Sequence, residues 1–248
     1  MNHNNFILSP IGEILKDMVS ASSGVGNGIE SFPLLDYIMQ ATFLKMTGAQ
    51  EQKMKCIGWE LATYDYEYRY KFTQKPLGEC SSYDEKEKFF NDIIYQIVKH
   101  GKKEFDIYSI DKQKLLTKTK QLINNTFSNT NLCGWTKRSF NEYFDIWNGI
   151  TPEYFLRQDK KYNLFSNSKS ISKNPKDTLI KMYEHMYVHR NRIAHNTLSY
   201  QQNLPTLNIL IKDENKLNNY FIYFSILILI DNIIISLYKQ YLDITENN

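Results

Sequence analysis

Proline and glycine are scarce in this sequence: its 248 residues include only six prolines and ten glycines. Folds made of many short strands need many tight turns, and such turns depend on these two residues. The scarcity therefore argues against a β-sandwich or a barrel and favours helices. Apolar residues make up 42% of the chain and charged residues 23%, proportions that are ordinary for a globular protein and too hydrophobic for a disordered one.

The sequence also shows neither closely spaced cysteine pairs nor the pattern of a leader segment. Cys56, Cys80 and Cys133 are odd in number and widely spaced, and no Cys-x-x-Cys pair occurs. We therefore expect reduced thiols in a cytoplasmic protein. The N-terminal residues show neither a basic region nor a long apolar stretch, so the sequence predicts no signal peptide.

Recognisable cofactor motifs are also absent. The glycines from Gly24 to Gly28 lack the Gly-Lys-Ser/Thr ending of a phosphate-binding loop and the third spaced glycine of a dinucleotide-binding motif. His185 and His189 share a helical face and suggest a metal site. No Asp or Cys completes that set at a usual spacing, however, and His195 falls on a different face. We expect no cofactor and no metal.

What the sequence does contain is a helical pattern of apolar residues along most of its length. The spacing predicts helices over residues 7–19, 34–46, 50–62, 84–100, 112–127 and 139–147. Residues 161–176 are rich in Ser, Asn and Lys, and we expect them to form an exposed linker. The pattern as a whole predicts an all-α fold.

A row of tyrosines interrupts the helical pattern. Tyr64, Tyr66, Tyr68 and Tyr70 alternate with charged residues, which is the period of a strand. The segment before them is helical, and no partner strand of comparable strength is present. We therefore expect the helix to continue here, with the rings packed against neighbouring helices. The alternative is an aromatic row that stacks on nucleic-acid bases.

The segment Tyr220–Tyr238 is strongly apolar and approaches the length of a membrane span. Asp231 and Asn232 lie in its second half, and a charge at that depth in lipid would be expensive. We therefore expect no membrane association and a helix buried in the protein core or in a subunit interface.

Positive charge is concentrated in one stretch, although the whole chain carries a net charge of only +3. Between Arg157 and Arg192 there are nine basic and three acidic residues. Such a stretch is either a surface for a phosphate backbone or an ordinary solvated face.

This basic stretch ends in the helix that carries the candidate chemistry. Asn174 is a favoured N-cap and Pro175 suits the first helical position, so we expect the helix to start near Pro175. Its apolar face consists of Leu179, Met182, Tyr183, Met186, Ile193 and Ala194, and Arg190 falls within that face. A guanidinium there needs a compensating partner, either a salt bridge in a structural protein or a phosphate at a functional site.

A second ridge of the same helix carries Glu184, Val188, Asn191 and His195, which are spaced four, three and four residues apart. The acid, amide and imidazole groups therefore line up beside the arginine. Asn191 is placed to orient His195 or a substrate phosphate. Glu184 is a candidate for fixing the imidazole tautomer of His195.

The local sequence Val188-His-Arg-Asn-Arg-Ile-Ala-His-Asn196 resembles the Arg-polar-x(4–6)-His motif of the HEPN superfamily (higher eukaryotes and prokaryotes nucleotide-binding). Four residues separate Arg190 from His195, and Asn191 matches the polar position. An apolar final helix follows the motif in that family, as residues 220–238 do here. The resemblance implies a HEPN-like helical domain over residues 131–248, with residues 1–130 as an additional N-terminal helical region that could pack with it as one unit.

The resemblance also implies an activity, namely metal-independent cleavage of RNA by attack of the ribose 2′-OH on the adjacent phosphate. Arg190, His195 and Asn191 would be the catalytic residues, with Glu184 in support. Arg192, Lys181 and Lys176 would bind the RNA.

Because each chain carries one motif, the resemblance implies a homodimer that shares its site. Bacterial proteins of this type and size are commonly toxins or phage-defence effectors, held inactive by a partner such as an antitoxin. Two alternatives remain open: a non-catalytic HEPN-type domain that binds nucleotides or partners, and a structural helical domain with a buried arginine.

Overall fold

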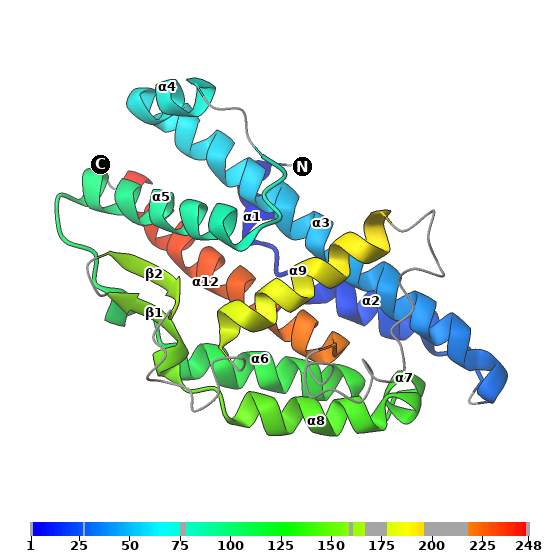
Figure 1. The fold of residues 1–248 in the computed structure, drawn as a ribbon. Helices are drawn as coiled ribbons and strands as arrows, with labels where there is room; N and C mark the ends of the chain where they lie inside the picture. The colour runs from blue at the N-terminus through cyan, green and yellow to red at the C-terminus, as the bar shows by residue number, and fades with distance from the viewer. Residues whose placement is uncertain are drawn as a thin grey trace.

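Helices form most of the part of the chain that the structure, a computed structural model, describes (Figure 1). The described residues are 2–26, 28–74, 78–158, 161–166, 178–195 and 218–246, without the side chains of Ile29, Trp135 and His195. The helices are α1 (His3–Leu8), α2 (Glu13–Ser22), α3 (Phe32–Tyr64), α4 (Tyr66–Gln74), α5 (Tyr83–Gly101), α6 (Lys112–Phe127), α7 (Asn131–Trp135), α8 (Lys137–Asn148), α9 (Leu179–His195) and α12 (Tyr220–Glu246). Within these ranges the only strands are β1 (Phe155–Gln158) and β2 (Tyr162–Phe165), so the prediction of an all-α fold is confirmed.

Two of the predicted helices are a single one, because α3 runs without a break through residues 47–49. Thr47 and Gln50 are buried there. The Gln50 amide donates a hydrogen bond to the carbonyl oxygen of Leu227 in α12, at 2.9 Å. This contact stabilises the middle of α3, where the apolar pattern of the sequence does not predict a helix.

The tyrosine row is helical, as predicted, but a break at Asp65 divides it between α3 and α4. The Asp65 carboxylate caps α4 by accepting a hydrogen bond from the backbone N–H of Tyr68 at 2.9 Å, and it also accepts one from Lys99 of α5 at 2.6 Å. Tyr68 is buried, whereas the other three tyrosine side chains are at least 60% exposed. The prediction that all four rings pack against neighbouring helices is therefore wrong for three of them, because the break turns those rings toward solvent.

The β-hairpin was not expected from the sequence. β1 and β2 pair antiparallel, with Phe155 opposite Phe165. Leu164 and Phe165 are fully buried and lie in the segment expected to be an exposed linker, so that expectation is wrong for residues 162–166. The hairpin is tied to α5, since the backbone N–H of Phe165 donates to the Tyr83 hydroxyl at 3.0 Å. Leu164 and Phe165 form a short apolar pair, and the polar residues around it kept the sequence from predicting a strand.

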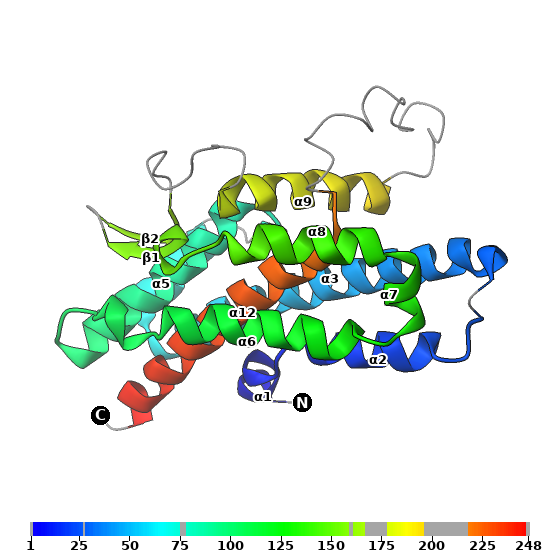
Figure 2. The same ribbon diagram turned by 90° about the horizontal axis from the view of Figure 1, so that it is seen from below.

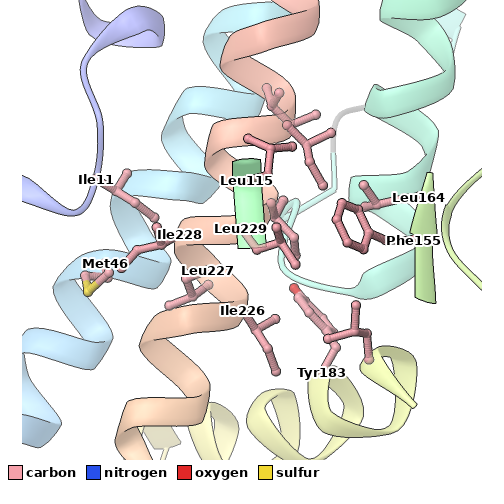
Figure 3. Close-up of a cluster of buried hydrophobic side chains, with 14 of the residues drawn as sticks. Ile11, Met46, Leu115, Phe155, Leu164, Tyr183, Ile226, Leu227, Ile228 and Leu229 are labelled. Carbon is pink, nitrogen blue, oxygen red and sulfur yellow. The ribbon is translucent and has the colours of Figure 1, made fainter. Parts of the chain in front are cut away.

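Helix α12 forms the centre of the core and contacts α3, α5, α6, α8 and α9 (Figures 1 and 2). Figure 3 shows part of this core, where residues 226–229 of α12 lie among buried side chains of α3, α6, the hairpin and α9. By length and composition α12 could cross a membrane, but 83% of its most apolar window is buried inside the protein. Of the two places left open by the sequence, core and subunit interface, α12 occupies the core, which is consistent with a soluble protein.

Buried side chains from residues 1–130 and from residues 131–248 belong to one hydrophobic core. The two ranges therefore pack as a single unit in the described part of the chain.

The charged residue in the middle of α12 has a buried partner. Lys53 of α3 donates to Asp231 at 2.5 Å, and the two side chains are 0% and 1% exposed. The backbone N–H of Ile11 donates to the other Asp231 oxygen at 3.0 Å, and Lys53 also donates to the carbonyl oxygen of Ser9 at 2.7 Å. Burial lowers the pKa of Lys53 and raises that of Asp231, and each charge opposes the shift of the other. The pair thus joins α3, α12 and the turn between α1 and α2.

Candidate functional site around Arg190

Helix α9, which carries the HEPN-like motif, lies against α3, α5 and α12 (Figure 1). It begins at Leu179, where the Thr178 hydroxyl accepts a hydrogen bond from the backbone N–H of Lys181 at 3.3 Å. The prediction that the helix starts near Pro175 is therefore too early, because Thr178 provides the cap. Asn174 and Pro175 themselves lie outside the described residues.

The apolar face of α9 points into the core as far as Arg190. Its first four members, Leu179, Met182, Tyr183 and Met186, are at most 2% exposed. The Arg190 side chain continues this face and is 16% exposed. Ile193 is half-buried and Ala194 is exposed. The predicted apolar face is therefore no longer buried in the last turn of α9. Arg190 lies at the boundary between core and surface.

The partner of Arg190 is Glu51 of α3, a residue that no motif in the sequence marks. Nη2 of Arg190 lies 3.1 and 3.3 Å from the two carboxylate oxygens of Glu51, which is 14% exposed. Burial raises the pKa of the Glu51 carboxyl, while the charges of Arg190 and Lys86 oppose that rise. The two residues are 139 positions apart, so no local pattern could have paired them.

Asn191 contacts Arg190 directly. Nη1 of Arg190 donates to the Asn191 side-chain oxygen at 3.1 Å and lies 3.9 Å from a carboxylate oxygen of Glu79. The Glu79 side chain is 73% exposed, so this second carboxylate approaches the guanidinium from the solvent side. Between them, Glu51 and Asn191 hold the guanidinium plane in one orientation.

A second buried cation, Lys86 of α5, lies at the same place. It is 1% exposed, and its ammonium donates to the carbonyl oxygen of Cys80 at 3.0 Å. Burial lowers the pKa of Lys86 to about 8, although the negative charge of Glu51 opposes the shift. The sequence did contain a signal for this residue. Lys86 falls on the apolar stripe of α5 with Phe89, Phe90 and Ile93, as Arg190 does on that of α9.

A small cavity connects these charged groups. Its volume is about 10 Å³, roughly the space for one water molecule. It is lined by Thr47, Glu51, Ser81, Lys86, Tyr183, Met186, Tyr187, Arg190 and Leu227. The Tyr183 hydroxyl donates to the carbonyl oxygen of Ser81 at 2.6 Å, which fastens the loop before α5 to α9. The site is thus a closed polar cluster at the edge of the core.

His195 is the last residue of α9, and its side chain lies outside the described part of the structure. Glu184, expected to support it, is 51% exposed and pairs with Lys181 at 2.6 Å. His195 follows Glu184 by eleven positions, which is roughly 16 Å along a helix axis. Glu184 therefore belongs to the solvent face of α9, and its support of His195 stays a prediction.

Of the residues expected to bind RNA, Arg192 and Lys181 are exposed on α9. Lys176 lies outside the described residues. Arg190 is thus the one described arginine of the motif that is turned toward the core.

Comparisons of the chain with protein-family models, with curated proteins and with solved structures found no match. The likeness to the HEPN superfamily therefore rests on the motif residues themselves.

His189 of α9 lies apart from this cluster. His189 packs among the rings of Phe43, Tyr220 and Tyr223, and its Nε2 lies 3.1 Å from the Tyr220 hydroxyl. Burial, helped by the nearby charge of Arg192, lowers the pKa of His189 to about 4. Among the described residues, no group of three or more His, Cys, Asp and Glu side chains could hold a metal ion.

The buried imidazole of His189 predicts that stability falls in mild acid. Its pKa of about 4 in the folded protein lies below its ordinary value of 6.5. Folding therefore favours the neutral ring, and the stabilisation is complete above pH 6.5 and lost as the pH falls toward 4. Between pH 7 and pH 5 the free energy of unfolding should drop by about 2 kcal/mol on this account.

Urea unfolding of the wild type and of His189→Phe at both pH values tests this expectation. Phenylalanine keeps an aromatic ring in the cluster but cannot be protonated, so the variant should lose most of the difference between pH 7 and pH 5. An equal difference in both proteins would mean that other groups cause it.

Proposed function

We propose that this chain is a metal-independent endoribonuclease of the HEPN type. The observation that carries the proposal is the position of Arg190, a guanidinium at the edge of the core, held by Glu51 and Asn191 in a motif that ends at His195. A desolvated and oriented guanidinium binds phosphate oxygens strongly. Nearby, His195 supplies the residue type that transfers protons near neutral pH.

The proposed reaction uses no metal ion and no cofactor. The 2′-oxygen of the ribose attacks the adjacent phosphorus, and the bond from phosphorus to the 5′-oxygen breaks. The products are a 2′,3′-cyclic phosphate and a 5′-hydroxyl. A proton leaves the attacking hydroxyl and another reaches the departing oxygen, and His195 serves in this transfer. Arg190 stabilises the charge that develops on the phosphate oxygens, while Arg192, Lys181 and Lys176 bind the RNA backbone.

The proposed active species is a homodimer, because one Arg190 and one His195 supply only part of the proton transfer and charge stabilisation. The sequence allows a subunit interface at the apolar segment 220–238, but α12 is buried within the chain itself. The solvent face of α9, where Val188 is 47% exposed, is the surface proposed instead. Residues beside a two-fold axis meet their own symmetry mates, so a dimer formed there places the helix ridge of Val188, Asn191 and His195 opposite its counterpart.

The biological setting that we propose follows from the same resemblance. It is a cytoplasmic toxin or phage-defence effector, kept inactive by an inhibitory partner such as an antitoxin.

A second candidate is a non-catalytic HEPN-type domain that binds a nucleotide or a partner. The salt bridge between Arg190 and Glu51 favours a non-catalytic role, because a guanidinium that is compensated within the protein is not free to stabilise a transition state. A buried arginine that has its carboxylate needs no phosphate.

The two candidates differ in what purified protein does to RNA. The nuclease should cleave single-stranded RNA in the presence of excess EDTA and leave DNA of the same sequence intact, because DNA lacks the 2′-OH nucleophile. Gel analysis of end-labelled substrates, with mapping of a cyclic phosphate at the new 3′ end, measures both. Cleavage of DNA at a similar rate, or activity that needs added metal, would exclude the mechanism. Binding without cleavage would favour the second candidate.

A further inference from the structure

Two cations, Arg190 and Lys86, meet at the carboxylate of Glu51, since the second carboxylate near Arg190, that of Glu79, lies 3.9 Å away and is 73% exposed. Arg190 and Lys86 both face the cavity beside Glu51, and among the described residues Glu51 is the one carboxylate that lines it. A single guanidinium already compensates the Glu51 carboxylate through two contacts of 3.1 and 3.3 Å. The ammonium of Lys86 is 1% exposed and adds a second positive charge. Burying an additional cation costs free energy unless an anion pairs with it.

The hydrogen bonds of Lys86 also support a role in binding an anion. An ammonium has three N–H donors, and among the described residues Lys86 forms one hydrogen bond, to the carbonyl oxygen of Cys80. The remaining N–H donors lie beside the cavity and near the negative charge of Glu51. Lys86 is therefore placed to bind a second negatively charged group that would also contact Arg190.

The loop that supplies this carbonyl is in a strained conformation. Cys80 has a φ of 62°, in the left-handed region that residues other than glycine rarely adopt. The same loop brings Glu79 to 3.9 Å from Arg190, and Ser81 accepts the hydrogen bond of Tyr183. The loop thus packs around the cluster, and its exposed Glu79 marks the side on which the cluster meets solvent.

We infer that Arg190 and Lys86 form a binding site for a phosphoryl oxyanion and that the Glu51 carboxylate occupies this site in the free protein. A carboxylate presents two oxygens to a guanidinium much as a phosphate does. The cavity of about 10 Å³ is too small for a phosphate. The ligand therefore enters only when the Glu51 side chain withdraws.

This inference deepens the proposed function and rests on it only for the identity of the ligand, which would be the phosphate of an RNA backbone. Glu51 is then a residue that limits access to the site, and Lys86 is a second residue that binds the phosphate. Neither belongs to the motif on which the family resemblance rests.

The experiment measures the affinity of the protein for inorganic phosphate by isothermal titration calorimetry at pH 7. Glu51→Gln removes the competing charge at nearly constant volume, and affinity should rise on the order of tenfold. Glu51→Ala removes both charge and volume, and should bind phosphate at least as tightly as Glu51→Gln. If Glu51 served only to position Arg190, both variants would instead bind phosphate more weakly than the wild type, and the inference would be overturned.

Lys86→Met, made in the Glu51→Gln background, tests the second cation. Phosphate affinity should fall on the order of tenfold relative to Glu51→Gln alone. The matched control is Lys88→Met in the same background, since Lys88 is exposed on the same helix, and it should change affinity less than about twofold. An equal loss in both variants would mean that only the general positive charge matters and would contradict the inference. If Lys86→Met fails to fold, as judged by thermal unfolding, the comparison of Glu51→Gln and Glu51→Ala with the wild type decides.

A separate arm identifies the source of the phosphate. A 2′-O-methyl oligoribonucleotide cannot be cleaved by 2′-OH attack, and it should displace inorganic phosphate from Glu51→Gln if the RNA backbone is the ligand. Phosphate binding that this oligonucleotide does not affect would assign the site to a free phosphate compound and would overturn the RNA backbone as its ligand. Phosphate binding with no RNA cleavage by the wild type would leave the site in place and refute the proposed nuclease.

Discussion

Substitution of either Arg190 or His195 by alanine should reduce RNA cleavage by about 10²- to 10⁴-fold, the loss typical of a positioned acid–base or charge-stabilising group. Arg190 is expected to contact the phosphate in the transition state, and His195 to move the protons. Single-turnover cleavage of a labelled RNA at saturating enzyme measures the chemical step without the contribution of product release.

The structure provides matched controls for this experiment. Arg192 is exposed on the same helix, so Arg192→Ala should weaken RNA binding with little effect on the single-turnover rate at saturation. Arg190→Lys keeps the charge but loses the planar two-donor geometry, and should fall between the wild type and Arg190→Ala. An essential Arg192 beside a dispensable Arg190 would show that the motif is assigned wrongly.

Removal of Arg190 also has a structural consequence that must be separated from catalysis. Arg190→Ala leaves the Glu51 carboxylate, which is 14% exposed, without its partner. Thermal unfolding of each variant therefore accompanies the kinetics. A rate lost together with the folded state says nothing about catalysis, whereas a rate lost in a folded protein supports the assignment.

The buried pair of Lys53 and Asp231 should produce the largest effect on stability. Asp231→Leu leaves the fully buried ammonium of Lys53 without its counterion, and the free energy of unfolding should fall by about 3–5 kcal/mol. Lys53→Met should cost a similar amount because it leaves the carboxylate unpaired. Urea unfolding at pH 7 measures both.

The double variant Lys53→Met, Asp231→Leu separates the pair from the general packing of the core. Since no charge remains buried, most of the lost stability should return, and the two substitutions should be strongly non-additive. The exposed pair of Lys45 and Asp17, which lie 3.7 Å apart, is a suitable control on α3 and α2. Lys45→Met should change stability by less than about 1 kcal/mol. Additive losses in the buried double variant would show that packing, and not charge pairing, explains the single effects.

The sequence by itself was sufficient for the helical class and for the buried character of residues 220–238. Both follow from local periodicity and composition, which determine whether a segment can bury one face or all of its faces. The position of Arg190 on an apolar face followed from the same spacing. Local patterns were weaker at segment ends, where the cap at Thr178 and the break at Asp65 depend on single hydrogen bonds.

Only the tertiary structure decided which charges meet. Glu51 and Arg190 are 139 residues apart, and Lys53 and Asp231 are 178 apart. These pairs form because α3 packs against both α9 and α12. The hairpin at residues 155–165 likewise depends on its burial against α5. A periodic pattern shows that a face will be buried but does not identify the surface that covers it, because that choice depends on contacts between segments distant in the chain.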